Sequence, residues 1–436
     1  MTLCRPAVPD TRFPTVLRAL RHRNFQLFFG GQLLSLTGTW MQHVAQAWLV
    51  YRLTGSTLLL GTVGFAGQIP VLLLSTLGGA VADRHSRHRV VVATQACSML
   101  LAFVLAGLTL SGHVRIWHII TLAALLGSIN AFDIPARQAF IVQMVGKEDM
   151  SNAIALNSSM FNAARVIGPA VAGVLVAAIG EGWCFLVNGV SFLAVIAGLL
   201  MMRLRAEAPH PSEGSALAHM LEGFRFARNT MPVRALLMLL GLLSLIGMPY
   251  AVLMPIFADR ILHGGARGLG MLMGAAGIGA VLGALTVAAR TGVKGLSRLV
   301  GWASVGFGVS LALFAFSRWF WLSFLLLIPV GYSQMLQLAC SNTLIQTMVP
   351  DRLRGRVMAI YSMMFMGMAP FGALLAGALA DRLGAPLTVA AGGMVCLGGA
   401  FLYRMHLPAI RKEARQLILA QETAREPAGP LPLRDV

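Results

Sequence analysis

The sequence predicts an all-α, polytopic membrane protein, and three observations support this fold class. Hydrophobic residues make up 57% of the 436-residue chain and charged residues only 11%. Its mean hydropathy is +0.75, whereas a soluble globular domain carries about 25% charged residues. Apolar runs of about 20 residues, each long enough to cross a hydrocarbon core, recur along the whole chain. The class therefore follows from composition and run length together.

The apolar runs predict twelve transmembrane helices, arranged as two sets of six. The first set lies at 24–51, 57–82, 90–111, 116–137, 152–179 and 183–203, and the second at 233–258, 267–289, 297–317, 319–342, 357–380 and 385–404. A polar stretch separates the two sets. We therefore expect a cytoplasmic N-terminal segment at 1–23, six-helix bundles at 24–204 and 232–405, a cytoplasmic connector at 205–231 and a cytoplasmic tail at 406–436.

The connector has a helical pattern of its own. Leu217, Met220, Leu221 and Phe224 recur at three- and four-residue spacing, which favours a short helix lying at the membrane interface. A solvated linker is the alternative.

Basic residues predict the orientation of the chain. With both termini inside the cell, six of the 34 lysines and arginines fall on the outer side, Arg165 falls within the membrane, and the other 27 are cytoplasmic. Short cytoplasmic loops carry such an excess of basic residues. The N-terminal segment has no apolar core that resembles a cleavable signal peptide.

The sequence argues against several classes of function, namely nucleic-acid binding, metal binding, ATP hydrolysis and enzymatic catalysis. The net charge of +18 comes from arginines in separate short loops, so we expect no nucleic-acid partner. Five cysteines are scattered without a close pair, which predicts neither a disulfide framework nor a metal site. The chain has no G-x-x-x-x-G-K-[ST] loop, so we expect no built-in ATPase and no cofactor. The sequence shows no pairing of a nucleophile with a base that would indicate an enzyme.

The loop after the second apolar run carries the most specific motif. It reads Gly79-x-x-x-Asp83-Arg84-x-x-Arg87-x-Arg89, which resembles the signature loop between spans 2 and 3 of the major facilitator superfamily. The two halves also match at a near-constant offset, for example Leu33–Leu36 with Leu242–Leu245. Six spans per half place both halves in the same sense across the membrane, which is the parallel repeat of this superfamily.

Three further short motifs indicate a subfamily: Leu53-Thr54-Gly55-Ser56, Asp133-Ile134-Pro135-Ala136-Arg137 and Gly168-Pro169. Together they resemble the bacterial exporter subfamily that includes enterobactin-type siderophore exporters and macrolide-type drug exporters. The resemblance implies proton-driven export of a small organic molecule by alternating access. An importer on the same fold, and a sensor or scaffold that does not transport, are the alternatives.

The resemblance also implies a conformational gate at the cytoplasmic face. Its candidate residues are Gly79, Asp83, Arg84, Arg87 and Asp133. We expect Asp83 to contact the start of the eleventh span near 355–358, where helix N–H groups favour a carboxylate, and Arg87 to pair with Asp133. The alternative is that these charges only set the topology.

Polar residues inside the spans give the candidate substrate or coupling site: Arg165, His43, Gln46, Tyr332 and Gln337. Arg165 lies roughly 20 Å from the cytoplasmic edge, at about 1.5 Å per residue. A guanidinium at that depth needs a polar cavity or an acid partner. Arg165 has two possible roles: it binds the substrate or couples transport to protons, or it is a structural residue that holds several hydrogen bonds. His43 fits either a proton carrier or a hydrogen-bonding residue.

Gly168, Pro169 and Gly173 are candidates for bending the fifth span, with plain small-residue packing as the alternative. As partners we expect a small-molecule substrate, a proton and the lipid bilayer, and we expect the chain to be a monomer. The expected location is the bacterial cytoplasmic (inner) membrane, as a multi-pass protein with both termini cytoplasmic.

Overall fold

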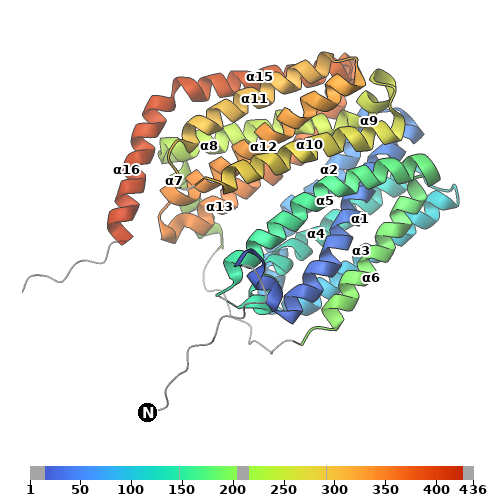
Figure 1. The fold of residues 1–436 in the computed structure, drawn as a ribbon, viewed down its shortest axis with the longest axis horizontal. Coiled ribbons are helices and arrows are strands. Elements are labelled where there is room, and N and C mark those ends of the chain that lie inside the picture. Colours follow the sequence, from blue (N-terminus) through green and yellow to red (C-terminus); the bar gives the residue numbers. More distant parts are fainter. Residues whose placement is uncertain (1–14, 147, 204–215, 291, 426–436) are drawn as a thin grey trace, which may run out of the picture. The chain divides into compact units, whose positions relative to one another are not determined.

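The computed structural model describes residues 15–146, 148–203, 216–290 and 292–425, and the described chain is built of helices joined by short turns (Figure 1). Within these ranges, eleven helical segments are long and apolar enough to cross a membrane. The predicted connector helix and the C-terminal tail also form helices, α7 (Ala216–Asn229) and α16 (Leu407–Arg425). The all-α polytopic fold class is thus confirmed.

The N-terminal half begins with a short 3-10 helix, η1 (Thr15–Arg21), followed by six long helices. They are α1 (Arg23–Thr54), α2 (Thr57–Arg84), α3 (Arg87–Leu110), α4 (Ile116–Val145), α5 (Met150–Ile179) and α6 (Glu181–Leu200). At 32 residues, α1 is long enough to span a membrane. It is absent from the eleven apolar segments because four glutamines and His43 lower its hydropathy.

The C-terminal half contains two interrupted segments. Met231–Ile261 is divided into α8 (Met231–Leu242), η2 (Leu243–Gly247), η3 (Met248–Leu253), α9 (Met254–Ile256) and η4 (Phe257–Ile261). Pro249 and Pro255 lie in this segment and remove backbone donors. The other segment is divided into α13 (Asp351–Met366) and α14 (Ala369–Leu383), with Pro370 at the start of α14. The uninterrupted helices are α10 (Gly265–Ala288), α11 (Leu296–Phe316), α12 (Phe320–Met348) and α15 (Ala385–Met405).

The chain divides into two compact units. The first contains residues 1–46 and 73–212, and the second contains residues 47–72 and 213–436. The C-terminal end of α1, the turn after it and the first half of α2 therefore belong with the C-terminal helices. The division into bundles at 24–204 and 232–405 stays a prediction.

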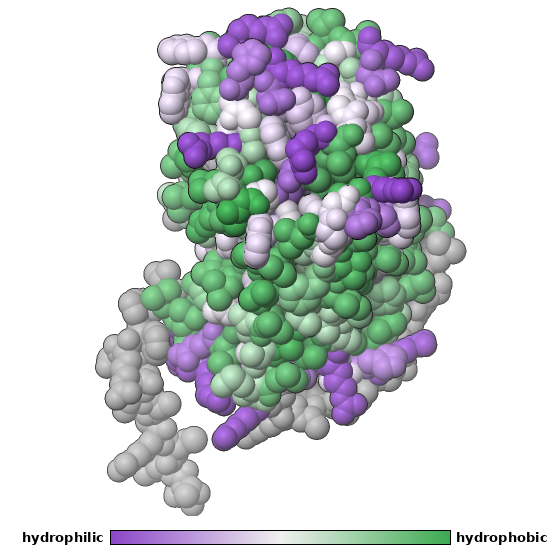
Figure 2. Space-filling model, turned by 90° about the vertical axis from the view of Figure 1, so that its right-hand side faces the viewer, coloured by the Kyte–Doolittle hydropathy of each residue, from purple (hydrophilic) through white to green (hydrophobic). Residues whose placement is uncertain are grey.

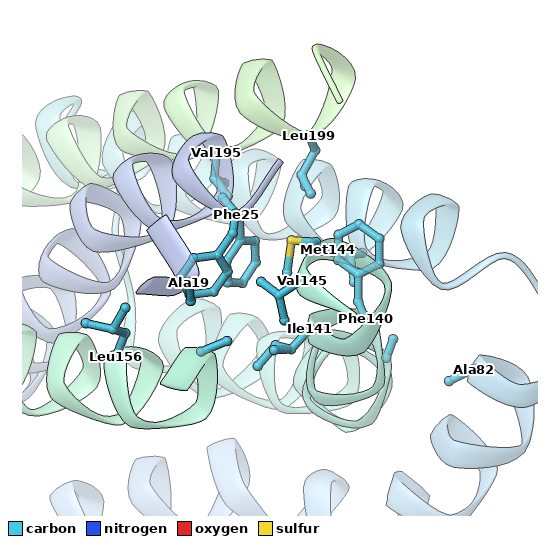
Figure 3. Close-up of a cluster of buried hydrophobic side chains, with 14 of the residues drawn as sticks. Ala19, Phe25, Ala82, Phe140, Ile141, Met144, Val145, Leu156, Val195 and Leu199 are labelled. Carbon is cyan, nitrogen blue, oxygen red and sulfur yellow. The ribbon is translucent and has the colours of Figure 1, made fainter. Parts of the chain in front are cut away.

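The first unit has an aromatic and aliphatic core where α1, α4 and α6 meet (Figure 3). Phe25 from α1, Phe140 from α4 and Leu199 from α6 are fully buried. Ala19 of η1 is also buried in this core. These contacts fix the three helices that carry most of the polar residues described below.

Small residues bring helices of the second unit into close contact. A Cβ added at Gly279 of α10 would overlap the Ile328 carbonyl of α12, and one at Gly331 of α12 would overlap the Ala276 carbonyl of α10. This reciprocal arrangement is typical of membrane helices, where small residues let backbones approach.

Large apolar side chains are exposed on many of the helices. Leu73, Leu200 and Met238 have exposed fractions of 68%, 66% and 67%. Figure 2 shows hydrophilic patches on a surface that is otherwise largely hydrophobic. Such extensive exposed apolar surface is explained by contact with lipid, because soluble monomers rarely expose large apolar patches.

Candidate functional site

A polar pocket of about 60 Å³ lies inside the first unit, between α1, α3, α4 and α6. Its lining is Gln32, Ser35, Leu36, Thr39, Gln42, His43, Gln95, Ser98, Leu126, Asn130, Asp133, Arg137, Asn188 and Phe192. This volume has room for about four water molecules. Pockets for drug-sized ligands are several hundred Å³, so this one suits water and protons and is too small for an organic cargo.

A regular spacing along α1 produces one wall of the pocket. Gln32, Ser35, Thr39 and Gln42 are separated by three, four and three residues, so they share one face of the helix. Asn188 of α6 donates from Nδ2 to Gln42 Oε1 over 2.7 Å. This bond joins α1 to α6 and gives two buried amides a partner.

Asp133 of α4 is the acid of the pocket and is 3% exposed. Its Oδ1 lies 2.8 Å from Thr94 Oγ1 and accepts from Gln95 Nε2 at 3.0 Å. Its Oδ2 pairs with Arg137 Nη2 at 3.2 Å, one helical turn along α4. A buried carboxylate is expensive unless it is paired and hydrogen-bonded, and this one is both.

The predicted Arg87–Asp133 ion pair is wrong for this structure. Within the described residues, Asp133 is paired with Arg137, and Arg87 instead donates from Nη1 to the Ala139 carbonyl at 3.4 Å. Arg137 is favoured because a residue four positions along the same helix is already adjacent.

Two side-chain oxygens of the pocket accept no hydrogen bond from the part of the chain that the structure describes. They are Gln32 Oε1 and Gln95 Oε1, and both are buried. Leaving a buried acceptor unpaired costs about 1–3 kcal/mol, and water in a polar pocket removes that cost. The pocket is therefore suited to hold water beside Asp133.

Arg165 of α5 lies outside this pocket, on a face that α5 shares with α1. Its guanidinium carbon is 5.9 Å from the centre of the Trp40 ring. Trp40 also contacts His43 and Phe161, with ring centres 6.0 and 5.7 Å apart. His43 is thus both a pocket residue and a neighbour of this aromatic group. Gln46 follows on α1 and is half-buried.

Gly168 explains how α1 and α5 approach so closely. A Cβ at Gly168 would lie 2.5 Å from Trp40 Cβ and 2.8 Å from the Thr37 carbonyl. Gly168, Pro169 and Gly173 are all buried within the continuous helix α5. Small-residue packing is therefore what Gly168 does in this structure, and a helix-bending role for the Gly-Pro element stays a prediction.

The remaining gate candidates lie at the α2–α3 turn. Asp83 and Arg84 are exposed, and Arg84 ends α2. Gly79 has open space where a side chain would be, whereas a Cβ at Gly78 would overlap the Ala131 carbonyl of α4. The glycine that packs α2 on α4 is thus Gly78, which the sequence analysis did not select. The Asp83 contact with 355–358 would join the two units and stays a prediction.

Tyr332 and Gln337 both lie on α12 of the second unit. Gln337 is fully buried; its Nε2 donates to Ser341 Oγ at 3.3 Å, and its Oε1 has no hydrogen-bond donor among the described residues. Tyr332 is half-buried. Grouping either residue with Arg165 in one site stays a prediction.

The sequence analysis missed Gln32, Gln95, Arg137 and Asn188 as pocket residues, and it missed Thr94 as a hydrogen-bond partner of Asp133. The polar residues Gln32, Ser35, Thr39 and Gln42 on one face of α1 could have indicated the pocket, because polar residues at helical spacing in an apolar segment indicate a buried polar contact.

Comparison with known proteins gives the family. Residues 15–427 match the family described as transmembrane secretion effector. The chain belongs to this family of major facilitator superfamily transporters. It is a membrane transporter rather than an enzyme.

Characterised relatives of similar length are exporters or other transporters. The staphyloferrin A transporter of Staphylococcus aureus is 27% identical over 380 residues, which cover 86% of this chain and 95% of that protein. The multidrug efflux pump Tap of Mycolicibacterium fortuitum is 29% identical, with 78% and 85% covered. The enterobactin exporter EntS of Citrobacter koseri is 26% identical, with 86% and 90% covered.

Solved structures agree on the fold. A mutant of the nucleoside transporter NupG superposes with a TM-score of 0.71 at 15% identity, covering 88% of this chain and 99% of that one. A bacterial homologue of the iron transporter ferroportin has a TM-score of 0.65 at 18% identity, with 90% and 98% covered.

Proposed function

We propose that this protein exports a small organic molecule from the cytoplasm across the bacterial inner membrane, in exchange for protons. Both termini and the connector are cytoplasmic in this proposal, as the distribution of basic residues predicts. Relatives named as exporters of siderophores and drugs support the direction. Alternating access between two six-helix bundles is the mechanism that the fold supports.

The observation that carries proton coupling is the position of Asp133. Its carboxylate is buried beside a pocket suited to water, and its charge is balanced by one arginine, Arg137. When a proton binds Asp133, the attraction to Arg137 is lost and a partly buried cation is left without its partner. That cost is large in a low-dielectric site, so protonation shifts the balance between two arrangements of the helices.

The proposal is tested by transport in inside-out membrane vesicles that carry the full-length protein. Staphyloferrin A and enterobactin are the cargoes to try first, because relatives are named for them. We expect accumulation of at least one of them when the vesicle lumen is acidified by respiration, and its loss when a protonophore is added. Accumulation that persists with the protonophore would remove antiport and leave export.

Cargo identity needs its own control. Vesicles from cells without the protein measure the background for each compound. If neither cargo accumulates above that background, a wider panel of the drug classes exported by cells carrying this protein is the next measurement. Uptake into right-side-out vesicles, driven by the same gradient, would instead favour an importer.

A further inference from the structure

Two helices of the second unit, α7 and α16, both contact α8 (Figure 1). Neither is one of the apolar segments that can cross a membrane. α7 ends at Asn229, directly before the spanning segment Met231–Ile261, and α16 begins directly after the spanning segment Ala385–Met405. Both helices therefore lie where spanning helices enter or leave the membrane, at the boundary between lipid and water.

Hydrogen bonds attach both helices to the first turn of α8. Arg234 of α8 donates from Nη1 to the Arg228 carbonyl of α7 at 3.2 Å. Glu413 Oε1 of α16 accepts from the Met231 amide at 3.2 Å. The exposed residues of α7, α16 and this first turn thus form one continuous region, which we call the boundary surface.

The face of α7 that lies away from the protein carries both apolar and basic side chains. The opposite face packs on α13, because a Cβ at Gly223 would lie 2.8 Å from a side-chain carbon of that helix. Leu221 and Phe224 are 62% and 51% exposed, and Arg225 and Arg228 are exposed beside them. These four positions recur at the spacing of one helix face. A helix with apolar and basic residues exposed together is typical of the membrane interface.

The boundary surface is positively charged. Two acids of α7 and α16 are already engaged: Glu222 pairs with Arg352 and Arg356 of α13, and Glu413 accepts from α8. The exposed cations are Arg225, Arg228, Arg234, Arg411, Lys412 and Arg415. This excess of cations favours an anionic partner. The exposed apolar side chains beside them favour a lipid over a soluble acidic molecule, because a soluble partner would leave them in water.

We propose that the boundary surface binds the headgroups of anionic phospholipids. Leu221 and Phe224 lie among the acyl chains, while Arg225 and Arg228 bind phosphate groups from beside them. Because Glu222 attaches α7 to α13, a lipid bound here also holds the start of a spanning segment. This partner is independent of the cargo and of proton coupling.

The test compares hydrogen exchange in residues 221–229 of the full-length protein in two kinds of nanodisc. One contains phosphatidylcholine alone, and the other contains equal parts of phosphatidylcholine and phosphatidylglycerol. We expect exchange to be about fivefold slower in the anionic discs, because a ligand that binds the folded helix stabilises it. Equal exchange in the two discs would overturn the proposal. The same slowing by inorganic phosphate in the phosphatidylcholine discs would also overturn it, by showing a site for free anions.

A paired substitution removes the charge from α7. Arg225→Gln combined with Arg228→Gln should abolish the slowing by phosphatidylglycerol. Both side chains are exposed, and Arg234 bonds to the backbone of residue 228, so that bond does not depend on the substituted side chains. The matched control is Arg318→Gln combined with Arg382→Gln, two exposed arginines of the same unit outside the boundary surface. An equal loss of slowing in the control pair would assign the effect to net charge and overturn the proposal.

Two further pairs separate charge, anchoring and folding. Arg225→Lys combined with Arg228→Lys keeps both charges and should retain most of the slowing; its complete loss would contradict binding by charge. Leu221→Ser combined with Phe224→Ser should speed exchange in both discs, and unchanged exchange would place α7 outside the interface. No cargo or proton gradient is used. Failure of the proposed transport would therefore leave these results intact, and failure of lipid binding would leave the proposed transport intact.

Discussion

Tyr51 Oη donates a hydrogen bond to Asp259 Oδ2 over 2.7 Å, which joins residues 208 positions apart in the chain. The Arg260 guanidinium carbon lies 5.6 Å from the centre of the Tyr51 ring. Nearby, Gly55 adopts a φ of +61°, and a Cβ there would lie 2.9 Å from Arg260 Nη2. These residues all belong to the second compact unit. The turn between α1 and α2 is thus attached to the π-helical segment η4 by side chains.

Aromatic and small residues continue this attachment along α2. Phe65 meets Phe371 of α14 edge to face at 5.9 Å. A Cβ at Gly61 would lie 3.1 Å from Gly377 Cα. Residues 47–72 are therefore held on the C-terminal helices by one polar cluster and one close helix contact. Movement of this segment requires that both be released.

The first prediction concerns the polar cluster. Tyr51→Phe and Asp259→Ala should each speed hydrogen exchange in peptides from residues 47–72, because each removes the same hydrogen bond, worth about 1 kcal/mol. The double variant should exchange no faster than the faster single variant. Mass spectrometry of the purified protein measures this. Additive effects of the two substitutions would show that they do not share one interaction.

The second prediction concerns Asp133. Asp133→Asn keeps acceptor capacity for Thr94 and Gln95 but removes the charge that balances Arg137. We expect it to abolish accumulation driven by a pH gradient while cargo still equilibrates across the vesicle membrane. Glu148→Gln is the matched control, since Glu148 is an exposed carboxylate of the same unit. Normal gradient-driven accumulation by Asp133→Asn would exclude this residue from coupling.

Much of the fold could be predicted from the sequence, because length and apolarity alone define a spanning helix. The predicted run 116–137 corresponds to α4 and the run 385–404 to α15, with α4 extending eight residues further. The extension, residues 138–145, was missed because it follows Arg137, a charged residue that ends an apolar run. That arginine is retained inside the helix because Asp133 pairs with it.

The pocket could not be predicted in the same way. Its residues come from four helices, and contacts such as that between Gln42 and Asn188 join positions 146 residues apart. The spacing of residues along one helix shows that the helix has a polar face. It does not show which polar face of another helix lies opposite. Arg165 was selected because its charge is costly in lipid wherever it lies. Its contact with Trp40 depends on Gly168, whose role is visible only once α1 and α5 are packed.

The third prediction concerns Asp149, outside the membrane-spanning helices. It is 1% exposed and pairs with Arg21 at 2.8 Å and His22 at 2.7 Å. Burial raises the pKa of its carboxyl, but hydrogen bonds from His22 and Arg18 and the charges of Arg18 and Arg21 outweigh burial and hold the pKa below its ordinary value of 3.8. A depressed pKa stabilises the folded state above the ordinary value, and that contribution is lost as pH falls through the lowered pKa.

Asp149 therefore stays ionised and holds η1 in place throughout the physiological pH range. Asp149→Asn should release this contact, and hydrogen exchange in residues 15–22 should become faster at neutral pH. Glu148→Gln, one residue away and exposed, should leave exchange unchanged. Protection that is equal in Asp149→Asn and the unaltered protein would show that Asn152, which accepts from the Ala19 amide at 2.8 Å, holds η1 without the acid.

The fourth prediction uses two adjacent glycines of α2 that differ in their surroundings. A Cβ at Gly78 would overlap the Ala131 carbonyl and lie 3.0 Å from Phe132 Cα, whereas Gly79 has no atom within 4 Å of that position. Gly78→Val should separate α2 from α4 and lower thermal stability, since overpacking costs about 1–3 kcal/mol. Gly79→Val should leave thermal stability close to that of the unaltered protein.

The pair also tests the gate that the motif implies at Gly79. Because a Cβ at Gly79 meets no atom within 4 Å in the described structure, we attribute a loss of transport without a loss of stability to a conformation in which the site is more crowded. We expect slower transport with unchanged unfolding temperature, measured on the same preparation. Full transport by Gly79→Val would remove Gly79 from the gate. A fall in unfolding temperature equal to that of Gly78→Val would instead show that both glycines serve only to pack α2.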